Sequence, residues 1–375
     1  MTTTTYDVVI AGAGIVGAAC ARECSQRGLR AAIVDSEGVG TGATAAGMGH
    51  IVVMDDSEAQ FTLTRHSQQL WHQLQPELPA DVEYEQCGTI WVAADEEEMQ
   101  EVRRKQGYYA QRGVPSQILD ESELAHLEPN LRRGMAGGLL VPEDGVLYPP
   151  CAARYLLECA QAAGARIVAG KVIKLSRGIV ALADGTTLSA GMVVNAAGAW
   201  ATELAPELNI RKRKGHLAIT DRYPGFVRHQ LVELGYLKSA HSTERDSVAF
   251  NVQPRKTGQV LIGSSRQFDV ESKEVDDEIL ARMLQRAQEY MPSLAQLSTI
   301  RVWTGFRAAT PDKLPLIGPC SYDASLFLAT GHEGLGITTS LATAQLLVDQ
   351  MVGTSSPIPH EPYLPGRTAK ECIHA

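Results

Sequence analysis

The feature that most restricts this chain is an ordered pattern in its first 35 residues. An apolar run at residues 8–11 predicts a buried parallel strand, and the segment G-A-G-I-V-G at residues 12–17 follows it directly. A helix is expected from Ala18 to about Gln26, and a second apolar run then ends at Asp35. A strand, G-x-G-x-x-G, a helix, a second strand and an acid indicate a Rossmann-like fold that binds a dinucleotide.

Each position in this pattern has a physical role. Gly12 permits the tight turn, Gly14 lets the backbone approach a pyrophosphate, and Gly17 lets the helix pack closely on the strand. The free N–H groups at the start of the helix favour phosphate. Asp35 can accept hydrogen bonds from a ribose diol and would repel a 2′-phosphate, so NADP is disfavoured. A glycine turn used only for packing would leave Asp35 unexplained.

The residues after Asp35 favour FAD over NAD. Residues 40–49 are small and rich in glycine, which lets the backbone lie against a flat ligand. A simple NAD-binding domain would be expected to continue directly into its next helix.

Charge and composition exclude several classes of protein. The formal net charge of −9 argues against nucleic acid as a partner. The basic cluster at residues 211–214 is interpreted as a solvated turn, with a rim that attracts an anionic substrate or acidic partner as the alternative. No apolar run of about 20 residues predicts a membrane span. We expect a cytoplasmic protein without a transmembrane segment, with peripheral membrane contact left open.

The seven cysteines are scattered and form no C-x-x-C pair. This argues against a disulfide framework and against zinc or iron–sulfur ligation within the chain. Cys20 and Cys24, four residues apart on the predicted helix, are expected to be small packing residues.

Hydrophobic periodicity organises the rest of the 375 residues, whose number suggests two or three domains. Helices are expected at residues 59–74, 95–111, 150–163, 275–290 and 338–352. Strands are expected at 88–93, 166–169, 172–175, 179–182, 192–194, 248–252, 259–263 and 325–330. The strand at 325–330, a glycine loop at 331–337 and the last helix repeat the nucleotide-binding theme, so the loop can turn N–H groups toward an electron-rich ring.

At this point the motifs resemble the family of D-amino-acid-oxidase-like flavoproteins, which includes glycine oxidase and sarcosine oxidase. The resemblance spans nearly the whole chain. The motifs that carry it are Gly12–Gly17 with Asp35, Ala45-Ala46-Gly47-Met48, residues 193–200, Trp303-x-Gly305-x-Arg307, Thr310-Pro311-Asp312, Pro315-x-x-Gly318 and Gly331-His332-x-Gly334-x-Gly336-Ile337.

The resemblance implies an α/β fold in which a Rossmann-like FAD-binding domain carries an inserted, antiparallel-sheet substrate domain of the α+β type. The FAD-binding domain would comprise residues 1–80, 145–215 and 301–375. The substrate domain would comprise residues 81–144 and 216–300.

The resemblance also assigns roles to residues. Asp35 would bind the adenosine ribose, Val172 the adenine, and Arg307 would clamp the carboxylate of the substrate. Chemistry supports Arg307 independently, since a guanidinium can pair bidentately with a carboxylate, although a structural ion pair is the alternative. The full set expected to contact FAD is Gly12, Gly14, Ile15, Val16, Gly17, Asp35, Ser36, Thr41, Gly42, Thr44, Ala45, Ala46, Gly47, Met48, Val172, Ala197, Gly198, Trp200, Gly331, His332, Glu333, Gly334, Leu335, Gly336, Ile337 and Thr338.

Two histidines are also candidates. His50 is expected either to face the substrate over the flavin, as a catalytic residue, or to be a hydrogen-bonded structural histidine. His332 is expected to shape the flavin loop. No metal site is expected.

Three positions depart from the family pattern. Gly305 stands where sarcosine oxidases carry a flavin-linking cysteine, so FAD should be non-covalent. Leu261 stands where those oxidases carry an oxygen-activating lysine, which weakens the case for an oxidase because a cation would stabilise developing superoxide. Ala308 replaces a common proline, so the local backbone should differ.

Within the family, residues 44–56 are most similar to the flavin subunits of multi-component dehydrogenases that act on D-hydroxyproline (cis-4-hydroxy-D-proline). Hydrogen cyanide synthase and opine oxidase subunits are relatives. The resemblance implies partner subunits with iron–sulfur clusters and further flavin, which would receive the electrons.

The expected reaction is oxidation of an amino-acid C–N bond to the imine, with hydride transfer from Cα to flavin N5. Two alternatives remain open. One is an oxidase of the glycine, D-amino-acid or sarcosine type that produces hydrogen peroxide. The other is a flavin-binding scaffold subunit without substrate turnover.

Overall fold

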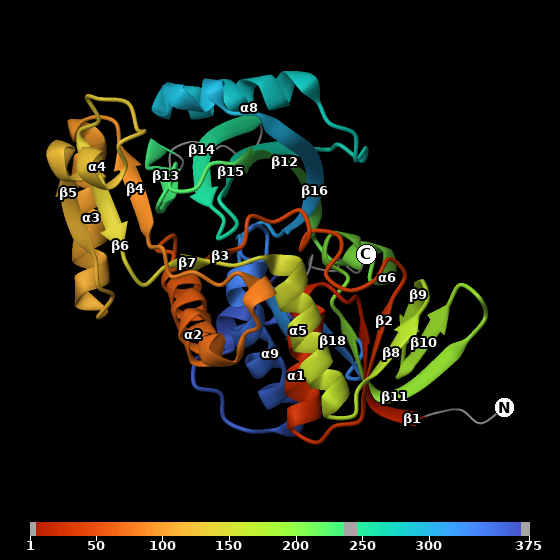
Figure 1. Ribbon diagram of the computed structural model, residues 1–375. Helices are drawn as coiled ribbons and strands as arrows, with labels where there is room; N and C mark the ends of the chain where they lie inside the picture. The colour runs from red at the N-terminus through yellow and green to blue at the C-terminus, as the bar shows by residue number, and fades with distance from the viewer. Residues whose placement is uncertain (1–4, 236–245, 369–375) are drawn as a thin grey trace, which may run out of the picture.

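Two large β-sheets organise the computed structural model, which describes residues 5–235 and 246–368 (Figure 1). The first sheet has the order β17-β18-β11-β1-β2-β8, and a hairpin of β9 and β10 extends from β11. Its strands are β1 (Thr5–Ala11), β2 (Ala31–Asp35), β8 (Arg166–Ala169), β9 (Val172–Ser176), β10 (Ile179–Leu182), β11 (Thr187–Asn195), β17 (Leu316–Pro319) and β18 (Leu326–Thr330). The pairs that join β18, β11, β1, β2 and β8 are parallel, as expected for a nucleotide-binding sheet.

Helices cover this first sheet. α1 (Ile15–Gln26) packs against both α5 (Pro149–Ala162) and α9 (Gly336–Val352), and α2 (Glu58–Leu74) packs against α9 (Figure 1). The inner face of α1 is built from small residues such as Ala18, Ala21 and Cys24, all fully buried, so the neighbouring helices can approach closely. Cys20 and Cys24 are free thiols in this core, which confirms that they are packing residues.

The second sheet has the order β16-β12-β15-β14-β13-β4-β6-β5 and lies above the first in Figure 1. Its strands are β4 (Thr89–Ala93), β5 (Gln117–Asp120), β6 (Gly137–Val141), β12 (Arg211–Arg222), β13 (Gln230–Glu233), β14 (Ser247–Pro254), β15 (Gln259–Phe268) and β16 (Thr299–Ala309). All of its pairs are antiparallel except β4 with β13. The predicted fold class is confirmed, with this one parallel pair inside the antiparallel sheet.

Three helices accompany the second sheet. α8 (Asp277–Tyr290) covers β14 and β15, where Tyr290 stacks on Phe250 with ring centroids 4.5 Å apart. α3 (Glu96–Gln111) and α4 (Glu121–Leu127) pack on the end formed by β4, β5 and β6. α8 and α4 pack with Ile90 and Leu231 on one face of the sheet, whereas α3 packs with Trp91 and Val232 on the other face, part of which also lines the cavity.

The predicted domain boundaries remain a proposal. Strand β12 begins at Arg211 and β16 ends at Ala309, so both strands extend from the second sheet into segments that we assign to the FAD-binding domain. These two strands therefore join the two parts of the molecule.

The structure places the basic cluster at residues 211–214 in a strand and not in the solvated turn that we predicted. It is the first part of β12, and Arg213 and Lys214 are only 7% and 3% exposed. Arg211 pairs with Asp269 at 2.8 Å, Lys212 with Glu271 at 2.9 Å, and Arg213 with Glu333. The solvated turn is wrong because these charges are neutralised by carboxylates from other segments.

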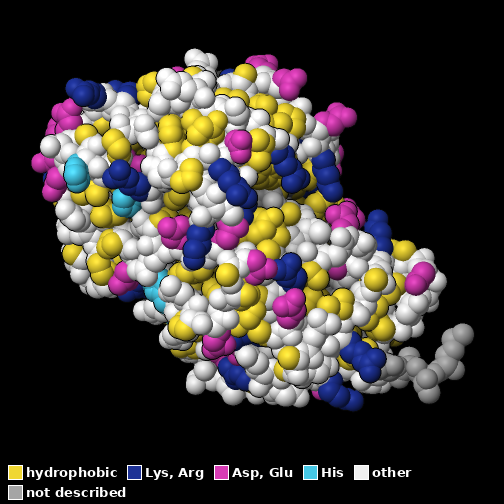
Figure 2. Space-filling view, in the orientation of Figure 1, with side chains coloured by type: hydrophobic (Ala, Val, Ile, Leu, Met, Phe, Trp, Pro, Cys, Tyr) yellow, Lys and Arg dark blue, Asp and Glu magenta, His cyan; other side chains and the backbone are white. Residues whose placement is uncertain are grey.

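The surface mixes both signs of charge. On the face drawn in Figure 2, basic and acidic side chains are interspersed, and hydrophobic side chains lie between them. Across residues 5–235 and 246–368, no helix is both long enough and apolar enough to cross a membrane.

Candidate functional site

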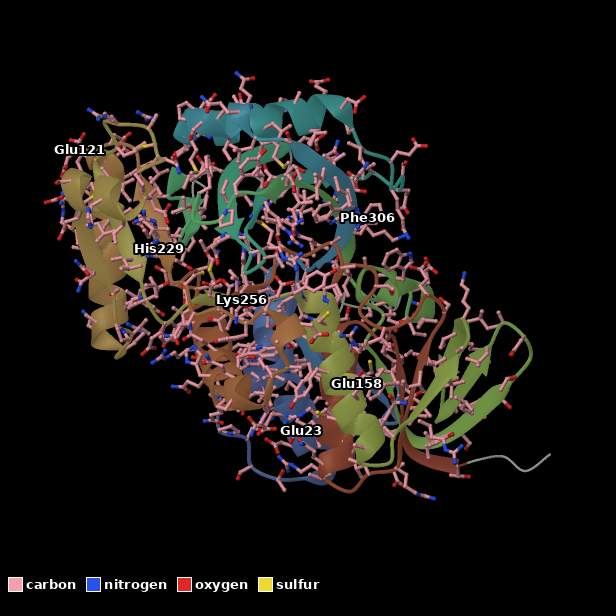
Figure 3. All side chains as sticks on the ribbon, in the orientation of Figure 1. Glu23, Glu121, Glu158, His229, Lys256 and Phe306 are labelled. Atoms are coloured by element: carbon pink, nitrogen blue, oxygen red, sulfur yellow. The ribbon has the colours of Figure 1, made fainter. Side chains whose placement is uncertain are left out.

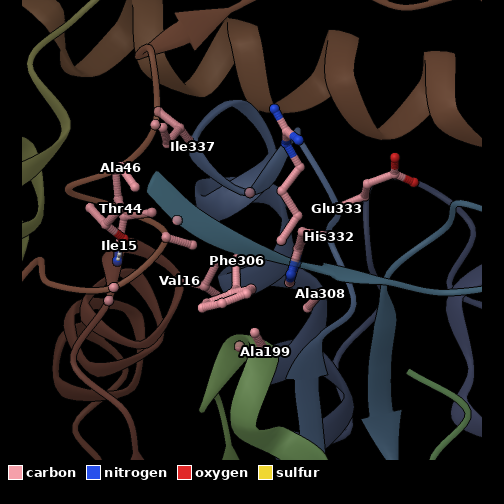
Figure 4. A pocket seen from close by; sticks show the side chains of 18 of the residues that line it. Ile15, Val16, Thr44, Ala46, Ala199, Phe306, Ala308, His332, Glu333 and Ile337 are labelled. Atoms are coloured by element: carbon pink, nitrogen blue, oxygen red, sulfur yellow. Dashed lines mark hydrogen bonds between the residues drawn. The ribbon is translucent and has the colours of Figure 1, made fainter. Parts of the chain in front are cut away.

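An extended cavity of about 550 Å³ connects the two sheets. Its walls come from the glycine loop after β1, the end of β2, residues 41–54, the segment after β11, strands β12 to β16, and the loop before α9. Figure 4 shows Ile15, Val16, Thr44 and Ala46 from the N-terminal segment on one side, with Phe306 and Ala308 of β16 facing the same space. Such a long channel suits an extended ligand.

Backbone conformation at the first glycine loop matches its predicted role. Gly12 has φ +107°, and a Cβ there would lie 2.6 Å from the carbonyl oxygen of Ala196. A Cβ at Gly17 would lie only 1.9 Å from the carbonyl oxygen of Gly12. Larger residues would therefore force apart β1, α1 and the segment after β11, which together form one end of the cavity.

Asp35 lies at the end of β2 and lines the cavity. One carboxylate oxygen accepts the N–H of Ala13 at 2.7 Å, and the other accepts the N–H groups of Glu37 and Gly38 at 2.8 and 3.0 Å. These bonds fix the carboxylate beside the glycine loop. A carboxylate has about four acceptor sites, so capacity remains for a ribose hydroxyl.

The cavity brings together nearly all residues that we expect to contact FAD. The exceptions are Gly17, Ala45 and Thr338. Gly17 lies at the contact of α1 with the glycine loop, Ala45 is exposed, and the Thr338 hydroxyl donates to the His50 carbonyl oxygen at 2.8 Å. Val172 lines the cavity next to Gly170 and Lys171, at the end of the first sheet that holds Asp35.

The late glycine loop is held rigidly. The ring Nε2 of His332 lies 3.0 Å from the Thr343 hydroxyl, and burial lowers the pKa of His332 to about 3. Glu333 adopts the left-handed region at φ +49°, donates its N–H to the Ala308 carbonyl at 2.8 Å, and pairs with Arg213. His332 is therefore a neutral residue that shapes the loop.

At the middle of the cavity, two glycines lie so close to residues of other segments that a larger side chain would not fit there. A Cβ at Gly305 would lie 2.2 Å from the Cβ of Ala46, and a Cβ at Gly47 would lie 2.6 Å from Cδ1 of Ile337. Three segments distant in sequence thus meet with little space for added atoms. A planar ring can lie against such small residues, so the residues present fit the flavin of FAD, with the pyrophosphate at the first glycine loop.

Arg307 extends over the neighbouring strands of the second sheet. It lines the cavity from β16, and a Cβ at Gly215 of β12 would lie 2.7 Å from its Nη1. Nη1 also donates to the Ser265 carbonyl of β15 at 2.9 Å. The guanidinium is therefore a fixed positive group in the cavity, with geometry suited to a carboxylate.

His50 lines the same cavity from β3 (His50–Ile51), and β3 pairs with β7 (Gly145–Val146). Burial lowers the pKa of His50 to about 4; a hydrogen bond with the Gln253 side chain opposes this, and the Arg307 charge adds a smaller lowering. The ring is therefore neutral near pH 7. Its Nε2 is buried and has no hydrogen-bond partner among the residues described by the structure, whereas the ring interacts with the Gln253 side chain, so both the catalytic and the structural interpretation of His50 stay open.

Sequence reasoning missed several lining residues. Phe306, whose position on β16 is labelled in Figure 3, packs edge to face with Trp200 at 6.2 Å between ring centroids. Other missed lining residues are Trp91, Gln230, Asn251 and Arg266, from four different strands. Their strands pair non-locally, so no local motif marks them.

No cysteine among the described residues lines the cavity, and no group of three or more His, Cys, Asp or Glu in that part of the chain could hold a metal ion.

Comparison with known proteins agrees with this geometry. The family model described as FAD dependent oxidoreductase, DAO, matches residues 7–350. The hydrogen cyanide synthase subunit HcnC of Pseudomonas aeruginosa is 29% identical, with 98% of this chain and 97% of that protein covered. Glycine oxidase of Geobacillus kaustophilus is also 29% identical, with 92% of each covered.

Solved structures show the same fold. Glycine oxidase of Geobacillus kaustophilus superposes with a TM-score of 0.87 at 26% identity, over 99% of this chain and 100% of that one. L-proline dehydrogenase of P. horikoshii superposes with a TM-score of 0.85 at 22% identity, over 97% and 98%.

Proposed function

The chain belongs to the DAO family of FAD dependent oxidoreductases, and on this premise we propose that it oxidises the C–N bond of a small amino acid to the imine. The observation that carries the proposal is Arg307, a guanidinium fixed in the same cavity as the flavin-binding loops. Bound FAD would accept the hydride that leaves the substrate carbon. Similarity to glycine oxidase over 92% of both chains supports an amino acid as the substrate.

The chain's own residues would orient the substrate and exclude water. Arg307 would pair with the carboxylate, which fixes the direction of the Cα–H bond. Met48 and Leu217 supply an apolar surface in the cavity, where they pack with Leu261 and Ile219. His50, neutral near pH 7, would contact the substrate without carrying a charge of its own.

D-hydroxyproline (cis-4-hydroxy-D-proline) is the proposed substrate, and partner subunits with iron–sulfur clusters and flavin are the proposed electron acceptors. The similarity of residues 44–56 to such dehydrogenase subunits supports this choice. The name of the relative HcnC, a subunit of hydrogen cyanide synthase, also supports a flavin chain that works in a complex.

An oxidase that reduces oxygen is the second candidate, because several glycine oxidases lie among the similar proteins. Against it, Leu261 stands at the position of the oxygen-activating lysine and is buried in the apolar cluster with Met48 and Leu217. A buried leucine supplies no charge to stabilise superoxide.

The test is anaerobic mixing of the FAD-loaded protein with a panel of D- and L-amino acids that includes proline derivatives. We expect the yellow absorbance of the flavin to bleach with at least one of them, most rapidly with cis-4-hydroxy-D-proline. Bleaching by none would overturn the amino-acid proposal and leave a flavin-holding scaffold.

The electron acceptor is tested separately with the best substrate. A dehydrogenase should reduce an artificial dye much faster than it consumes oxygen. Rapid oxygen consumption with stoichiometric hydrogen peroxide would favour the oxidase.

A further inference from the structure

Three neutral polar side chains line the cavity, and each has one buried nitrogen or oxygen atom without a hydrogen-bond partner among the described residues. Trp91, Gln230 and Asn251 are 3%, 2% and 8% exposed. The indole Nε1 of Trp91, Oε1 of Gln230 and Oδ1 of Asn251 are buried and form no hydrogen bond with any described residue. Burial of an unpaired polar atom costs about 1–3 kcal/mol, so a set of three at one cavity indicates a ligand group that pairs with them.

Strand register places these side chains on one face of the second sheet. Trp91 of β4 pairs with Val232 of β13, and Val232 pairs with Asn251 of β14. Paired residues share a face, and Gln230 lies two residues before Val232, so it shares that face as well. Val232 also lines the cavity, which confirms that this face is turned toward it.

Arg307 lines the same cavity as these three residues, from the other end of the same sheet. The guanidinium lies over β12 and reaches the Ser265 carbonyl on β15, and β14 with Asn251 is the next strand. Neighbouring strands are about 4.8 Å apart, so Asn251 on β14 lies one strand spacing from β15, Gln230 on β13 two and Trp91 on β4 three, each with a further offset along the strands from Ser265. A substrate whose carboxylate binds Arg307 and whose side chain or ring extends along the cavity would reach Asn251 first of the three.

The chemistry of the three atoms selects the group. An indole N–H only donates, and amide oxygens only accept. An ammonium would face the Trp91 donor, and a carboxylate would face the two amide oxygens. A hydroxyl both accepts and donates, so it can satisfy Trp91 and one amide together.

We propose that Trp91, Gln230 and Asn251 form a recognition surface for a hydroxyl group on the side chain or ring of the amino-acid substrate. This inference rests on the proposed function, because it assumes that Arg307 binds the carboxylate. It deepens that function by naming the residues that would select a hydroxylated neutral amino acid, such as the proposed hydroxyproline, over glycine and over apolar or charged amino acids. A substrate without the hydroxyl would leave the three atoms unpaired, and a site of this kind discriminates strongly against such analogues.

The experiment compares matched pairs in anaerobic flavin reduction: 4-hydroxyproline with proline, and serine with alanine, each as D and L forms. We expect kcat/KM to be at least about tenfold higher for the hydroxylated member of the preferred pair. The near-isosteric variants Asn251→Leu and Gln230→Met should each reduce that ratio about tenfold, mainly by slowing the hydroxylated substrate.

Control variants come from the same strands. Leu231→Met and Val252→Ile change neighbours that face away from the cavity, into the core on the other side of the sheet, and the ratio should stay unchanged. Binding provides a readout without turnover. Calorimetry should show tighter binding of 4-hydroxytetrahydrofuran-2-carboxylate than of tetrahydrofuran-2-carboxylate, and Asn251→Leu should remove the difference.

The two proposals fail differently. If no amino acid bleaches the flavin, the proposed function fails, and the calorimetric comparison still decides whether the hydroxyl is recognised. If amino acids bleach it but hydroxylated and plain members react and bind alike, or if the variants leave the ratio unchanged, the hydroxyl recognition is wrong and the proposed function stands.

Discussion

At the scale of single residues, the proposed substrate end of the cavity combines the cation of Arg307 with neutral polar groups from other strands. Arg307 was predictable because a guanidinium within an otherwise apolar, small-residue stretch needs an anionic partner. Trp91, Gln230 and Asn251 were not predictable, because they share a face only after β4, β13 and β14 pair in one particular register. Parallel pairing of β4 with β13 joins residues about 140 positions apart, and local patterns carry no information about it.

The first prediction concerns Arg307. We expect Arg307→Ala to raise the substrate KM strongly and to lower kcat/KM by roughly 30-fold or more, because loss of a desolvated charge partner costs about 2–5 kcal/mol. Arg307→Lys should recover only part of this loss, since an ammonium cannot pair bidentately. FAD content, measured by absorbance, should not change. Arg301→Lys, an exposed position on the same strand, is the matched control, and a normal KM in Arg307→Ala would reject the clamp.

At the scale of elements, the helices and the nucleotide-binding strands followed from periodicity and glycine spacing. The predicted helix at 59–74 appears as α2, that at 275–290 as α8 and that at 338–352 as α9, each within about two residues. Strand β12 was missed because both of its faces are buried between residues 213 and 220, so its polar and apolar residues do not alternate. Basic residues that find carboxylate partners in distant segments resemble a surface turn when the sequence is considered alone.

The second prediction concerns the contact of α1 with the first glycine loop. Gly17→Ala would place its Cβ against the Gly12 carbonyl, so we expect α1 to shift and FAD affinity to fall at least about tenfold. Fluorescence titration of the apoprotein with FAD measures this. Gly107→Ala on α3 is the control, since a Cβ there meets nothing within 4 Å and helix propensity should slightly stabilise the protein. Equal FAD affinity in both variants would contradict the assigned role of Gly17.

The third prediction concerns Asp144, a buried carboxyl that joins α2 to the segment after β3. One oxygen accepts the Val53 N–H at 3.1 Å and the Gln68 amide at 2.8 Å, and the other has no partner among the described residues. Burial raises the pKa of Asp144 to about 7 from an ordinary value of 3.8. The Asp144 carboxyl therefore ionises at lower pH in the unfolded chain than in the folded one. Its contribution to the stability of the wild-type protein should decrease as pH rises from about 4 to about 7.

Asp144→Asn removes this ionisation. We expect the variant to gain stability relative to wild type as pH rises through that interval, with a constant difference above about pH 8. Urea unfolding of both FAD-loaded proteins at several pH values measures the change. Stability curves that run parallel between pH 4 and pH 8 would show that Asp144 is ionised throughout.

At the scale of the whole molecule, two sheets share one cavity, and strands β12 and β16 connect them. The nucleotide-binding sheet could be predicted because its motif is local, whereas the order of strands in the second sheet could not. That order depends on long-range pairing, such as β4 with β13 and β12 with β16.

The fourth prediction concerns attachment of the cofactor. Acid precipitation of the purified protein should release all of the yellow flavin into the supernatant. A cysteine at position 305 would meet the Ala46 Cβ, and none of the described cysteines lines the cavity, so no thiol is placed to bond the ring. Flavin that stays with the precipitated protein would demonstrate a covalent link and contradict this prediction.

The strand order of the second sheet also places the carboxylate-binding residue and the proposed specificity residues on different strands. The anchor for the acid group depends on β12, β15 and β16 at one edge, whereas the proposed discriminating side chains stand on β4, β13 and β14 further along. Mutational libraries restricted to positions 91, 230 and 251 should therefore redirect substrate choice while cofactor loading survives in most clones.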